Sequence, residues 1–446
     1  MESEGSGMET AISEQEYTAS LHLAMKQAER HEREIYRLKN SVTYRLGEHL
    51  TASARRPWKL LFLPLTFPYH SFLLGLEKIG LKAPPNDNFL GSSFDDHSEN
   101  CVLLFPTNGV GFGHFTRMYS VAKAIRRHSP DTEVIFFTPM PTLHIPYIED
   151  FPTYHIAGKY KFKNMSSTQW NGLIEEQLLM ILETHKPKLF MFDGAYPYRG
   201  MLNAIRRKPL MNKVWMRRGM FKKGSKIPID SIQFFDTIIH PGDAITVQEQ
   251  VLTHSVETKH VPPILLVRED EMLSKDEARS RLGVPHSVEV WYVQLGAGQI
   301  NDIESEIRVT IDALLKHNAE SFIVIGESLL GKRVSFTNER VRILRDYPNA
   351  IYFKAFDYSI QAGGYNSFHE MRTSQIPTIF YPNMNTGMDD QLARCKVAEQ
   401  EGWGIVVEQR HSQSIREGIH QIKSKNSILE FPKRELNNGE WVLDLA

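Results

Sequence analysis

After residue 100 the chain repeats one pattern, in which a short apolar run is followed by a longer stretch of mixed polarity. Nearly continuous apolar runs are typical of strands buried on both faces, and the stretches between them, such as Arg117–Arg127 and Leu173–Leu182, are typical of helices. Strands that alternate with helices predict a parallel sheet covered on both sides. The runs are CVLLF, EVIFF, KLFMF, KVWM and DTIIH in a first group, and VEVWYVQL, SFIVIG, AIYF, YSIQA, TIFYP and GIVVE in a second.

The two groups of strands predict an α/β architecture of two Rossmann-like domains facing each other across a cleft. Turn-forming and charged residues at 83–100 predict a linker, and Pro262 and Pro263 mark a hinge between the groups. Ligands of such sheets bind beyond the carboxyl ends of the strands. The expected units are an amino-terminal helical extension with the linker, and two Rossmann-like domains. Their expected ranges are 1–97, 98–262 and 263–446.

The extension begins with a segment, 14–50, whose apolar residues recur in steps of three and four. This spacing favours a short coiled coil or a helical hairpin, through which a homo-oligomer could form, over the alternative of a disordered segment. The first sixteen residues are acidic and polar and lack the apolar stretch of a secretory signal, so we expect a cytoplasmic protein.

The rest of the extension contains one long apolar segment, Trp58–Leu76. It has the length of a membrane span, but Pro64 and Pro68 interrupt it, so we expect a poor transmembrane helix. Because basic residues precede it, the region 55–76 fits an element at an anionic membrane surface. The alternative is that it caps the core of the next domain. The basic residues are Arg55, Arg56 and Lys59.

The composition of the chain excludes some classes of binding partner. The chain has 446 residues and a formal net charge of −1, so no strong field attracts it to nucleic acid, and we expect no nucleic-acid partner. It has two cysteines, far apart in sequence, which argues against a disulfide framework or a thiolate metal site and suits a reducing compartment. We expect no metal ligands.

A glycine-rich turn, NGVGFGHFTR, follows the first strand. Gly111 and Gly113 allow close approach of the backbone to a ligand, and the helix that follows offers free N–H groups. Such turns bind dinucleotides, bind other anions or only pack tightly. The second strand ends in Thr and Pro, without the acid that a dinucleotide-binding site needs for the ribose. His114 in this turn is either a general base or a cap of the turn.

The second half has two matching turns, QLGAGQIND and AGGYNSFHEM. Their backbone N–H groups, with an amide and a hydroxyl, would hold a diphosphate. Glu370, one helical turn further on, could accept hydrogen bonds from a ribose diol. The segment MDDQL starts another helix with groups suited to sugar hydroxyls, although acids at a helix start are also common on their own account. The candidates are Gly296, Gly298, Gly363, Gly364, Asn366 and Ser367 for the diphosphate, and Asp389, Asp390 and Gln391 for the sugar.

These motifs resemble a family. GGYNSFHEMRTSQIPTIFYPN followed by MDDQLARC is similar to the donor-binding signature of GT-B glycosyltransferases, nearest to the enzymes that add N-acetylglucosamine to the peptidoglycan lipid intermediate and their galactolipid-synthase relatives. Glu370 follows Gly364 by the six residues of that pattern. NGVGFGHF resembles the glycine-rich loop of the family's amino domain, with His114 at its histidine position. HVPPILLVRED followed by QLGAGQIND resembles the interdomain segment and the diphosphate loop.

This resemblance covers about residues 101–425 and implies a GT-B fold, a UDP-sugar donor, inversion at the anomeric carbon and no required metal or other cofactor. The first Rossmann-like domain would bind the acceptor and the second the donor. The chain departs from the pattern at Arg394 and Cys395, where the family has asparagine and alanine, and in lacking serine before Gly364. These departures bear on the identity of the sugar more than on the fold.

The expected reaction is transfer to an acceptor hydroxyl that a base in the first domain activates. His114 is the first choice for the base, and Asp193 either serves as base itself or orients the imidazole. Arg217 and Arg218, after KVWM, could bind a phosphate of a lipid-linked acceptor or could be ordinary surface arginines. Gly111 and Gly113 would lie beside the acceptor.

The amino-terminal piece YRLKNSVTYRLGEHLTASARRPWKLL resembles a segment that precedes transferases of bacterial capsules and other surface polysaccharides. The combined hypothesis is a UDP-sugar-dependent hexosyltransferase of cell-envelope glycan synthesis, acting on a lipid-linked or glycan acceptor at the inner face of the cytoplasmic membrane. One alternative is a UDP-sugar 2-epimerase or hydrolase of the same fold. Another is a scaffold of a polysaccharide assembly without catalytic activity.

Overall fold

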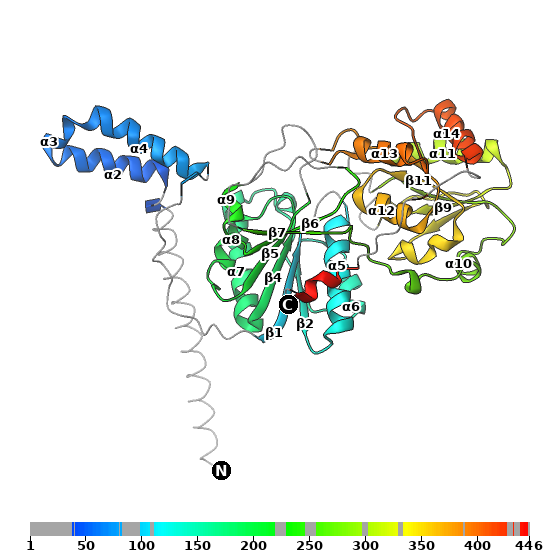
Figure 1. Cartoon of the computed structure of the whole chain (residues 1–446), viewed down its shortest axis with the longest axis horizontal. Helices are drawn as coiled ribbons and strands as arrows, with labels where there is room; N and C mark the ends of the chain where they lie inside the picture. The colour runs from blue at the N-terminus through cyan, green and yellow to red at the C-terminus, as the bar shows by residue number, and fades with distance from the viewer. Residues whose placement is uncertain are drawn as a thin grey trace, which may run out of the picture. The chain divides into compact units, whose positions relative to one another are not determined.

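The computed structural model describes residues 38–39, 41–79, 81–82, 99–107, 111–218, 229–245, 256–296, 302–328, 333–386, 389–425, 431 and 438–444. The chain divides into two compact units, Met1–Asp95 and Asp96–Ala446. The first is helical and the second contains both sheets (Figure 1).

The helical unit is a hairpin of α2 (Val42–Ala54) and α4 (Leu63–Lys78), joined through the short α3 (Pro57–Leu60). The two long helices lie side by side (Figure 1). The interruption that we expected at the prolines is wrong, because α4 runs through both. Pro64 lies in the first turn, where a backbone N–H has no partner within the helix, and only Pro68 removes a bond. Of the predicted coiled coil, residues 14–37 lie outside the described part.

No helix in the described residues is both long and apolar enough to cross a membrane.

In the second unit, the described residues form two all-parallel sheets, each the centre of a Rossmann-like half. The first sheet has the order β3-β2-β1-β4-β5-β6-β7 and the second β10-β9-β8-β11-β12-β13. The expected fold class is confirmed. The elements of the first half are β1 (Glu99–Pro106), α5 (Gly113–His128), β2 (Glu133–Thr138), α6 (His144–Ile148), β3 (Thr153–His155), η1 (Lys159–Lys161), α7 (Ser167–His185), β4 (Pro187–Asp193), α8 (Arg199–Ile205), β5 (Asn212–Met216), α9 (Ile229–Ile232), β6 (Thr237–Pro241) and β7 (Glu257–Val261).

The second half follows the same alternation of strand and helix. Its elements are η2 (Glu269–Glu271), α10 (Lys275–Leu282), β8 (Val290–Gln294), α11 (Ile303–His317), β9 (Phe322–Gly326), β10 (Val341–Leu344), η3 (Asn349–Ala355), β11 (Tyr358–Ala362), α12 (Tyr365–Ser374), β12 (Thr378–Tyr381), α13 (Gln391–Gln400), β13 (Gly404–Val406), α14 (Ser412–Lys425) and η4 (Glu440–Asp444).

The central strands show why their sequences are apolar without a break. Val102 and Leu104 of β1 pack in the cluster that contains the α5 side chains, whereas Leu103 and Phe105 pack with α7 and α8. Figure 1 shows α5 and α7 on opposite sides of this sheet. Because successive side chains of a strand point to opposite faces, a strand covered on both faces needs apolar residues at every position.

One predicted strand is wrong. The run AIYF lies in the 3₁₀ helix η3, where Ala350, Tyr352 and Phe353 are buried. A short apolar run does not distinguish a strand from a buried helical turn. The strand at this edge of the second sheet, next to β9, is instead β10. Its sequence, VRIL, has an exposed arginine in the middle.

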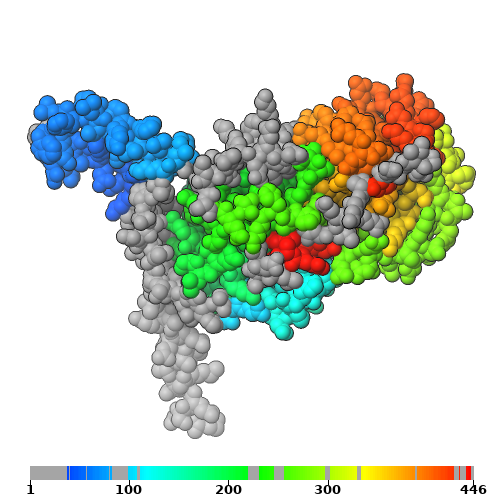
Figure 2. All heavy atoms as spheres, in the orientation of Figure 1, coloured from blue at the N-terminus to red at the C-terminus, as the bar shows by residue number. Residues whose placement is uncertain are grey.

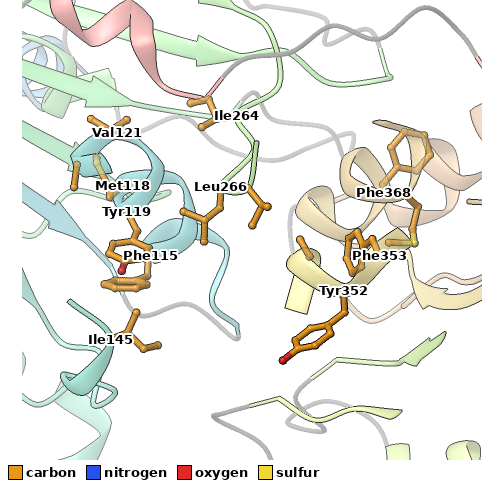
Figure 3. Close-up of a cluster of buried hydrophobic side chains, with 14 of the residues drawn as sticks. Phe115, Met118, Tyr119, Val121, Ile145, Ile264, Leu266, Tyr352, Phe353 and Phe368 are labelled. Atoms are coloured by element: carbon orange, nitrogen blue, oxygen red, sulfur yellow. The ribbon is translucent and has the colours of Figure 1, made fainter. Parts of the chain in front are cut away.

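An apolar cluster joins the two halves of the second unit. Figure 3 shows Ile264 and Leu266 of the connecting segment between the α5 side chains and Phe353 and Phe368 of the second half. The Ser120 hydroxyl of α5 also donates to the Leu265 carbonyl, at 2.7 Å. The segment that we expected to act as a hinge is therefore also part of a core.

The carboxyl-terminal residues return to the first half. η4 packs against α5, Val442 is fully buried in the joining cluster, and the Asn438 side-chain amide donates to the Leu265 carbonyl at 3.0 Å. The expected range 263–446 placed this segment in the second half. The sequence pattern shows that Val442 is apolar but not which core receives it.

Gly439 provides a test of this packing. Its φ is +83°, and an added Cβ would lie 2.9 Å from the Val121 Cα of α5, whereas Gly402, with φ +88°, has nothing within 4 Å of an added Cβ. Gly402→Ala should lower the free energy of unfolding by about 1–2 kcal/mol, because a side chain is unfavourable in the left-handed region. The same backbone cost applies at Gly439. Gly439→Ala should cost roughly 1–3 kcal/mol more, because the side chain also overpacks. Thermal or urea unfolding measures both, and equal losses would show that the added methyl group at residue 439 does not overpack against α5.

Candidate functional site

The first group of site residues lies at the carboxyl edge of the first sheet. His114 is in the first turn of α5, directly after the glycine-rich turn, and Asp193 is the last residue of β4. β1 and β4 are parallel neighbours whose ends pair Pro106 with Asp193. Residues that follow β1 and end β4 therefore meet at this edge.

His114 and Asp193 are in direct contact. The His114 Nδ1 lies 2.6 Å from Asp193 Oδ1. The Arg117 guanidinium, one helical turn after His114, donates its Nε to Oδ2 at 2.9 Å and its Nη2 to Oδ1 at 2.8 Å. The Asp193 and Arg117 side chains are each 1% exposed, whereas the His114 side chain is 25% exposed.

This arrangement fixes the charge of the carboxyl and the tautomer of the ring. Burial alone would raise the pKa of Asp193, but the charges and hydrogen bonds of Arg117 and His114 hold it below its ordinary value. A carboxylate 2.6 Å from a ring nitrogen requires a proton between them, so Nδ1 of His114 carries the hydrogen. Nε2 is then the basic nitrogen, and it has no hydrogen-bond partner among the described residues.

The second group is an ion network between the halves. Arg394 of α13 is fully buried and donates Nε and Nη2 to the two oxygens of Asp243, which follows β6, at 2.8 and 2.7 Å. The same Nη2 reaches Asp389 Oδ1 at 2.6 Å, and Arg218, which follows β5, reaches that oxygen at 2.5 Å. His369 Nε2 lies 3.4 Å from Asp243.

Tyr365, the first residue of α12, lies at the centre of these charges. Its buried ring lies 5.5, 4.6 and 5.9 Å from the guanidinium carbons of Arg117, Arg218 and Arg394, and its hydroxyl donates to the Gly242 carbonyl at 2.8 Å. Burial alone would raise the pKa of Asp389, but the positive charges of Arg218 and Arg394 outweigh it, so the pKa is lowered. The two groups of site residues are thus joined by one aromatic ring.

The network uses two residues for which the sequence suggested other partners. Asp389, a candidate for sugar binding, and Arg218, a candidate for acceptor phosphate, bind each other. Asp390 caps α13 by accepting from the Ala393 N–H, the common role of an acid at a helix start. The Gln391 side chain accepts from the Asn383 backbone, and Arg217 is buried beside the Trp215 ring.

The start of α12 is the turn for which the sequence predicts donor binding. Gly364 is its N-cap residue and no side chain caps the helix, so its first N–H groups are open to an anion. Gly363 is required, because an added Cβ would lie 2.4 Å from Cys395 Sγ. The Asn366 Oδ1 is buried with no hydrogen-bond partner in the described part of the chain. Ser367 lies in the same helical turn and is partly exposed.

The turn at the start of α12 meets the glycine-rich turn of the first half. A Cβ added at Gly113 would lie 3.9 Å from Asn366 Oδ1, which places the residue next to His114 against the start of α12. Gly111 is exposed in the same turn. In the other predicted turn Gly296 has φ +97°, and Gly298 lies outside the described residues.

Glu370, one helical turn after Asn366 in α12, lines a pocket. Its carboxyl has no hydrogen bond or ion pair among the described residues, and burial raises its pKa to about 7. A partly buried acid with no partner is expensive in the free protein and is typical of a ligand-binding position. The pocket is lined by Leu265, Val267, Glu269, Met272, Ala350, Phe353, Lys354, Glu370, Thr373 and Ser374.

Sequence reasoning missed several residues of the site. Arg117 and Asp243 were not candidates, although Asp243 follows a strand at the carboxyl edge, where such residues should be sought. Arg394 counted only as a departure from the family pattern. In the structure this arginine links the two halves, so the departure has a structural role of its own.

No metal-binding group of three or more His, Cys, Asp or Glu side chains occurs within the described residues.

No protein-family model matches the sequence, and no curated protein matches it either. Among solved structures, the spinosyn forosaminyltransferase SpnP is similar with a TM-score of 0.53 and 14% identity, over 77% of this chain and 97% of that chain. MurG of Acinetobacter baumannii is similar with a TM-score of 0.52 and 13% identity, over 77% and 98%. The UDP-GlcNAc 2-epimerase of Methanocaldococcus jannaschii is also similar, with a TM-score of 0.51 and 10% identity, over 77% of this chain and 99% of that chain.

These similarities, at such low identities, concern the fold. The chain has the GT-B fold of two Rossmann-like domains, as the resemblance implied. Nearly all of each similar chain is matched by 77% of this one, so a further part of this chain lies outside the shared fold.

Arg394→Met should destabilise the protein by about 3–5 kcal/mol, because it leaves the buried Asp243 carboxylate without its main partner. Arg308→Met, which removes an exposed pair with Glu304, should cost less than about 1 kcal/mol. In the first variant the pKa of Asp243 rises, so the deficit should shrink as the pH falls and the carboxyl takes up a proton. Urea unfolding across pH measures this, and a small, pH-independent loss would contradict it.

Proposed function

We propose that this chain is a glycosyltransferase that moves a sugar from a UDP-sugar to an acceptor hydroxyl with inversion at the anomeric carbon. The observation that carries the proposal is the position of His114. Its ring is fixed by Asp193 through Nδ1, its Nε2 has no partner among the described residues, and its turn lies against the open start of α12. A base beside an anion-binding helix start suits transfer from a diphosphate.

In the proposed reaction the acceptor hydroxyl gives its proton to His114 Nε2. Its oxygen attacks the anomeric carbon from the face opposite the diphosphate, the bond between that carbon and the diphosphate oxygen breaks, and UDP leaves. Asp193 acts by positioning the ring and stabilising the imidazolium, because its own carboxylate is bound by Arg117 and its pKa is lowered. Between the two candidates for the base, this favours His114.

The donor diphosphate would lie at the start of α12. The backbone N–H groups after Gly364, with the Asn366 and Ser367 side chains, can carry the charge that develops on the leaving group, so the proposal needs no metal. Gly296 and Gly298 would complete this site. Glu370 would accept hydrogen bonds from the ribose, which would give its unpaired carboxyl a partner.

The sugar and the acceptor would lie on either side of Asp389 and Arg218. Because these two side chains form an ion pair, a sugar hydroxyl or a phosphate reaching one of them would compete with the other. Asp390 and Gln391 would contribute less, since the first caps α13 and the second holds the backbone of Asn383. Gly111, Gly113, Arg217 and Arg218 remain the proposed acceptor side, and a lipid-linked or glycan acceptor of cell-envelope synthesis remains the proposed substrate class.

UDP should raise the unfolding temperature more than CDP, GDP or ADP do. At about a hundred times its dissociation constant a ligand adds roughly 2.7 kcal/mol of stability. Glu370→Gln should abolish most of the shift, because a neutral amide has one acceptor oxygen for the ribose hydroxyls where a carboxylate has two charged ones. Glu269→Gln, the same change at an exposed acid of the same pocket, should keep it. No shift with any nucleotide would instead favour a scaffold without catalytic activity.

Glu370→Gln, which should weaken UDP binding, should stabilise the protein without ligand. The pKa of Glu370 is about 7 in the folded state and about 4.5 when unfolded, so the folded protein binds more protons between these values and its stability falls as the pH rises through them. Glu370→Gln should remove that loss and stabilise the free protein above pH 7 by on the order of 2 kcal/mol. Below about pH 4 the two proteins should be equally stable.

His114→Ala should keep UDP-dependent stabilisation and lower transfer by about 10²–10⁴-fold, the usual contribution of a positioned base. His128→Ala, at the exposed end of the same helix, is the matched control and should retain activity. The assay is UDP release from a panel of UDP-sugars with a bacterial lipid extract as the source of acceptors. Full activity of the His114 variant would contradict the assignment, and a 2-epimerised sugar or acceptor-independent hydrolysis would favour the alternative enzymes.

A further inference from the structure

The helical hairpin at the amino terminus has polar contacts between its helices beside the buried Leu74. The His49 Nε2 lies 3.0 Å from the Thr66 hydroxyl, and the His49 and His70 rings stack at 4.9 Å between α2 and α4. Near the open end of the hairpin, Arg45 donates to Glu77 at 2.5 Å. A hydrogen bond, a ring stack and an ion pair therefore join the two helices.

The outward face of α3 and α4 is apolar. Leu61, Leu65, Tyr69 and Phe72, spaced four, four and three residues apart, are 81%, 75%, 64% and 62% exposed. Leu65, Tyr69 and Phe72 lie on one side of α4 by this spacing, whereas Leu61 lies in the turn before α4, and Trp58 and Phe62 extend the apolar surface, at 60% and 54%. Large apolar side chains gathered on one face are unusual on a protein surface and mark a binding surface.

The charge around this face has one sign. Residues 55–76 contain Arg55, Arg56 and Lys59 and no Asp or Glu, whereas the whole chain has a net charge of −1. The acid that follows, Glu77, is paired with Arg45 and with Lys82. Within residues 55–76 the apolar face is therefore accompanied by basic residues and by no acid.

We propose that this face of α3 and α4 docks into the interfacial layer of an anionic lipid membrane. The apolar side chains would enter the boundary of the acyl chains while the basic residues meet the lipid headgroups. α4 has 16 residues, about 24 Å of helix, which is shorter than the roughly 30 Å hydrocarbon core of a bilayer. The helix therefore lies in the plane of the membrane and does not cross it.

The charge pattern favours lipid over a second copy of the chain. A second copy would bring the same basic residues against this face, whereas an anionic headgroup layer has the complementary charge. The helical unit, drawn in blue in Figure 2, lies apart in sequence from the sheets that contain the proposed transfer site. The inference concerns binding alone and does not depend on the proposed function.

The test is flotation of the full-length protein with vesicles of phosphatidylcholine, alone or mixed with phosphatidylglycerol. The protein should float with the mixed vesicles, less as salt is added, and hardly with phosphatidylcholine alone. Leu61→Glu with Leu65→Glu should lower the bound fraction at least about tenfold. Ile148→Glu with Leu210→Glu, two other leucine or isoleucine positions that are each 75% exposed, should leave it unchanged.

A second measurement does not rely on a disruptive variant. Both native cysteines, Cys101 and Cys395, are buried, so an environment-sensitive dye should label a Leu65→Cys protein selectively. Its emission should shift to the blue with anionic vesicles, whereas the dye at Leu210→Cys should not respond. Equal binding of all the variants, equal binding to both vesicles, or a Leu61–Leu65 variant that loses only a dimer in sedimentation would overturn the proposal.

Discussion

The arrangement of the site depends on a buried arginine that has carboxylates on both sides. Arg394 is 0% exposed and binds Asp243 of the first half and Asp389 of the second. An unpaired charge in this position would cost several kcal/mol, so the two halves must bring their carboxylates together for the arginine to be buried at all. With Arg117, Arg218 and Asp193, the described residues of this region place three guanidinium groups near one tyrosine ring and pair them with three carboxylates.

This charge balance would allow the base and the anion-binding turn that we propose to share one small region. A diphosphate needs positive potential, whereas a general base must not be forced to hold its proton permanently. The Asp193 carboxylate forms an ion pair with Arg117, which balances the positive charge of that guanidinium. The same carboxylate also fixes the tautomer of His114. The open N–H groups of α12 provide positive potential without a titrating side chain.

The sequence predicted the fold well, because strands buried on both faces leave an unmistakable apolar pattern, as in β1 and β4. It was less informative where one short run fits two structures, as for AIYF in η3, and for β10, which has polar positions. In the site it predicted the His114 and Asp193 pair, since both follow from positions at strand ends. It missed Asp243 and Arg394, because an ion pair between residues 151 positions apart has no local signature.

Glu370 shows most clearly how a structure can indicate a ligand that it does not contain. The buried Asp243 carboxylate is held by the bidentate bonds of Arg394, whereas the Glu370 carboxyl lines a pocket with no partner among the described residues and has a raised pKa. A group that destabilises the free protein is retained in evolution only where another interaction compensates for it, and binding of a hydroxylated ligand would do so. The stability and the ligand affinity of the Glu370→Gln protein should therefore change in opposite directions, which a purely structural role for this acid does not predict.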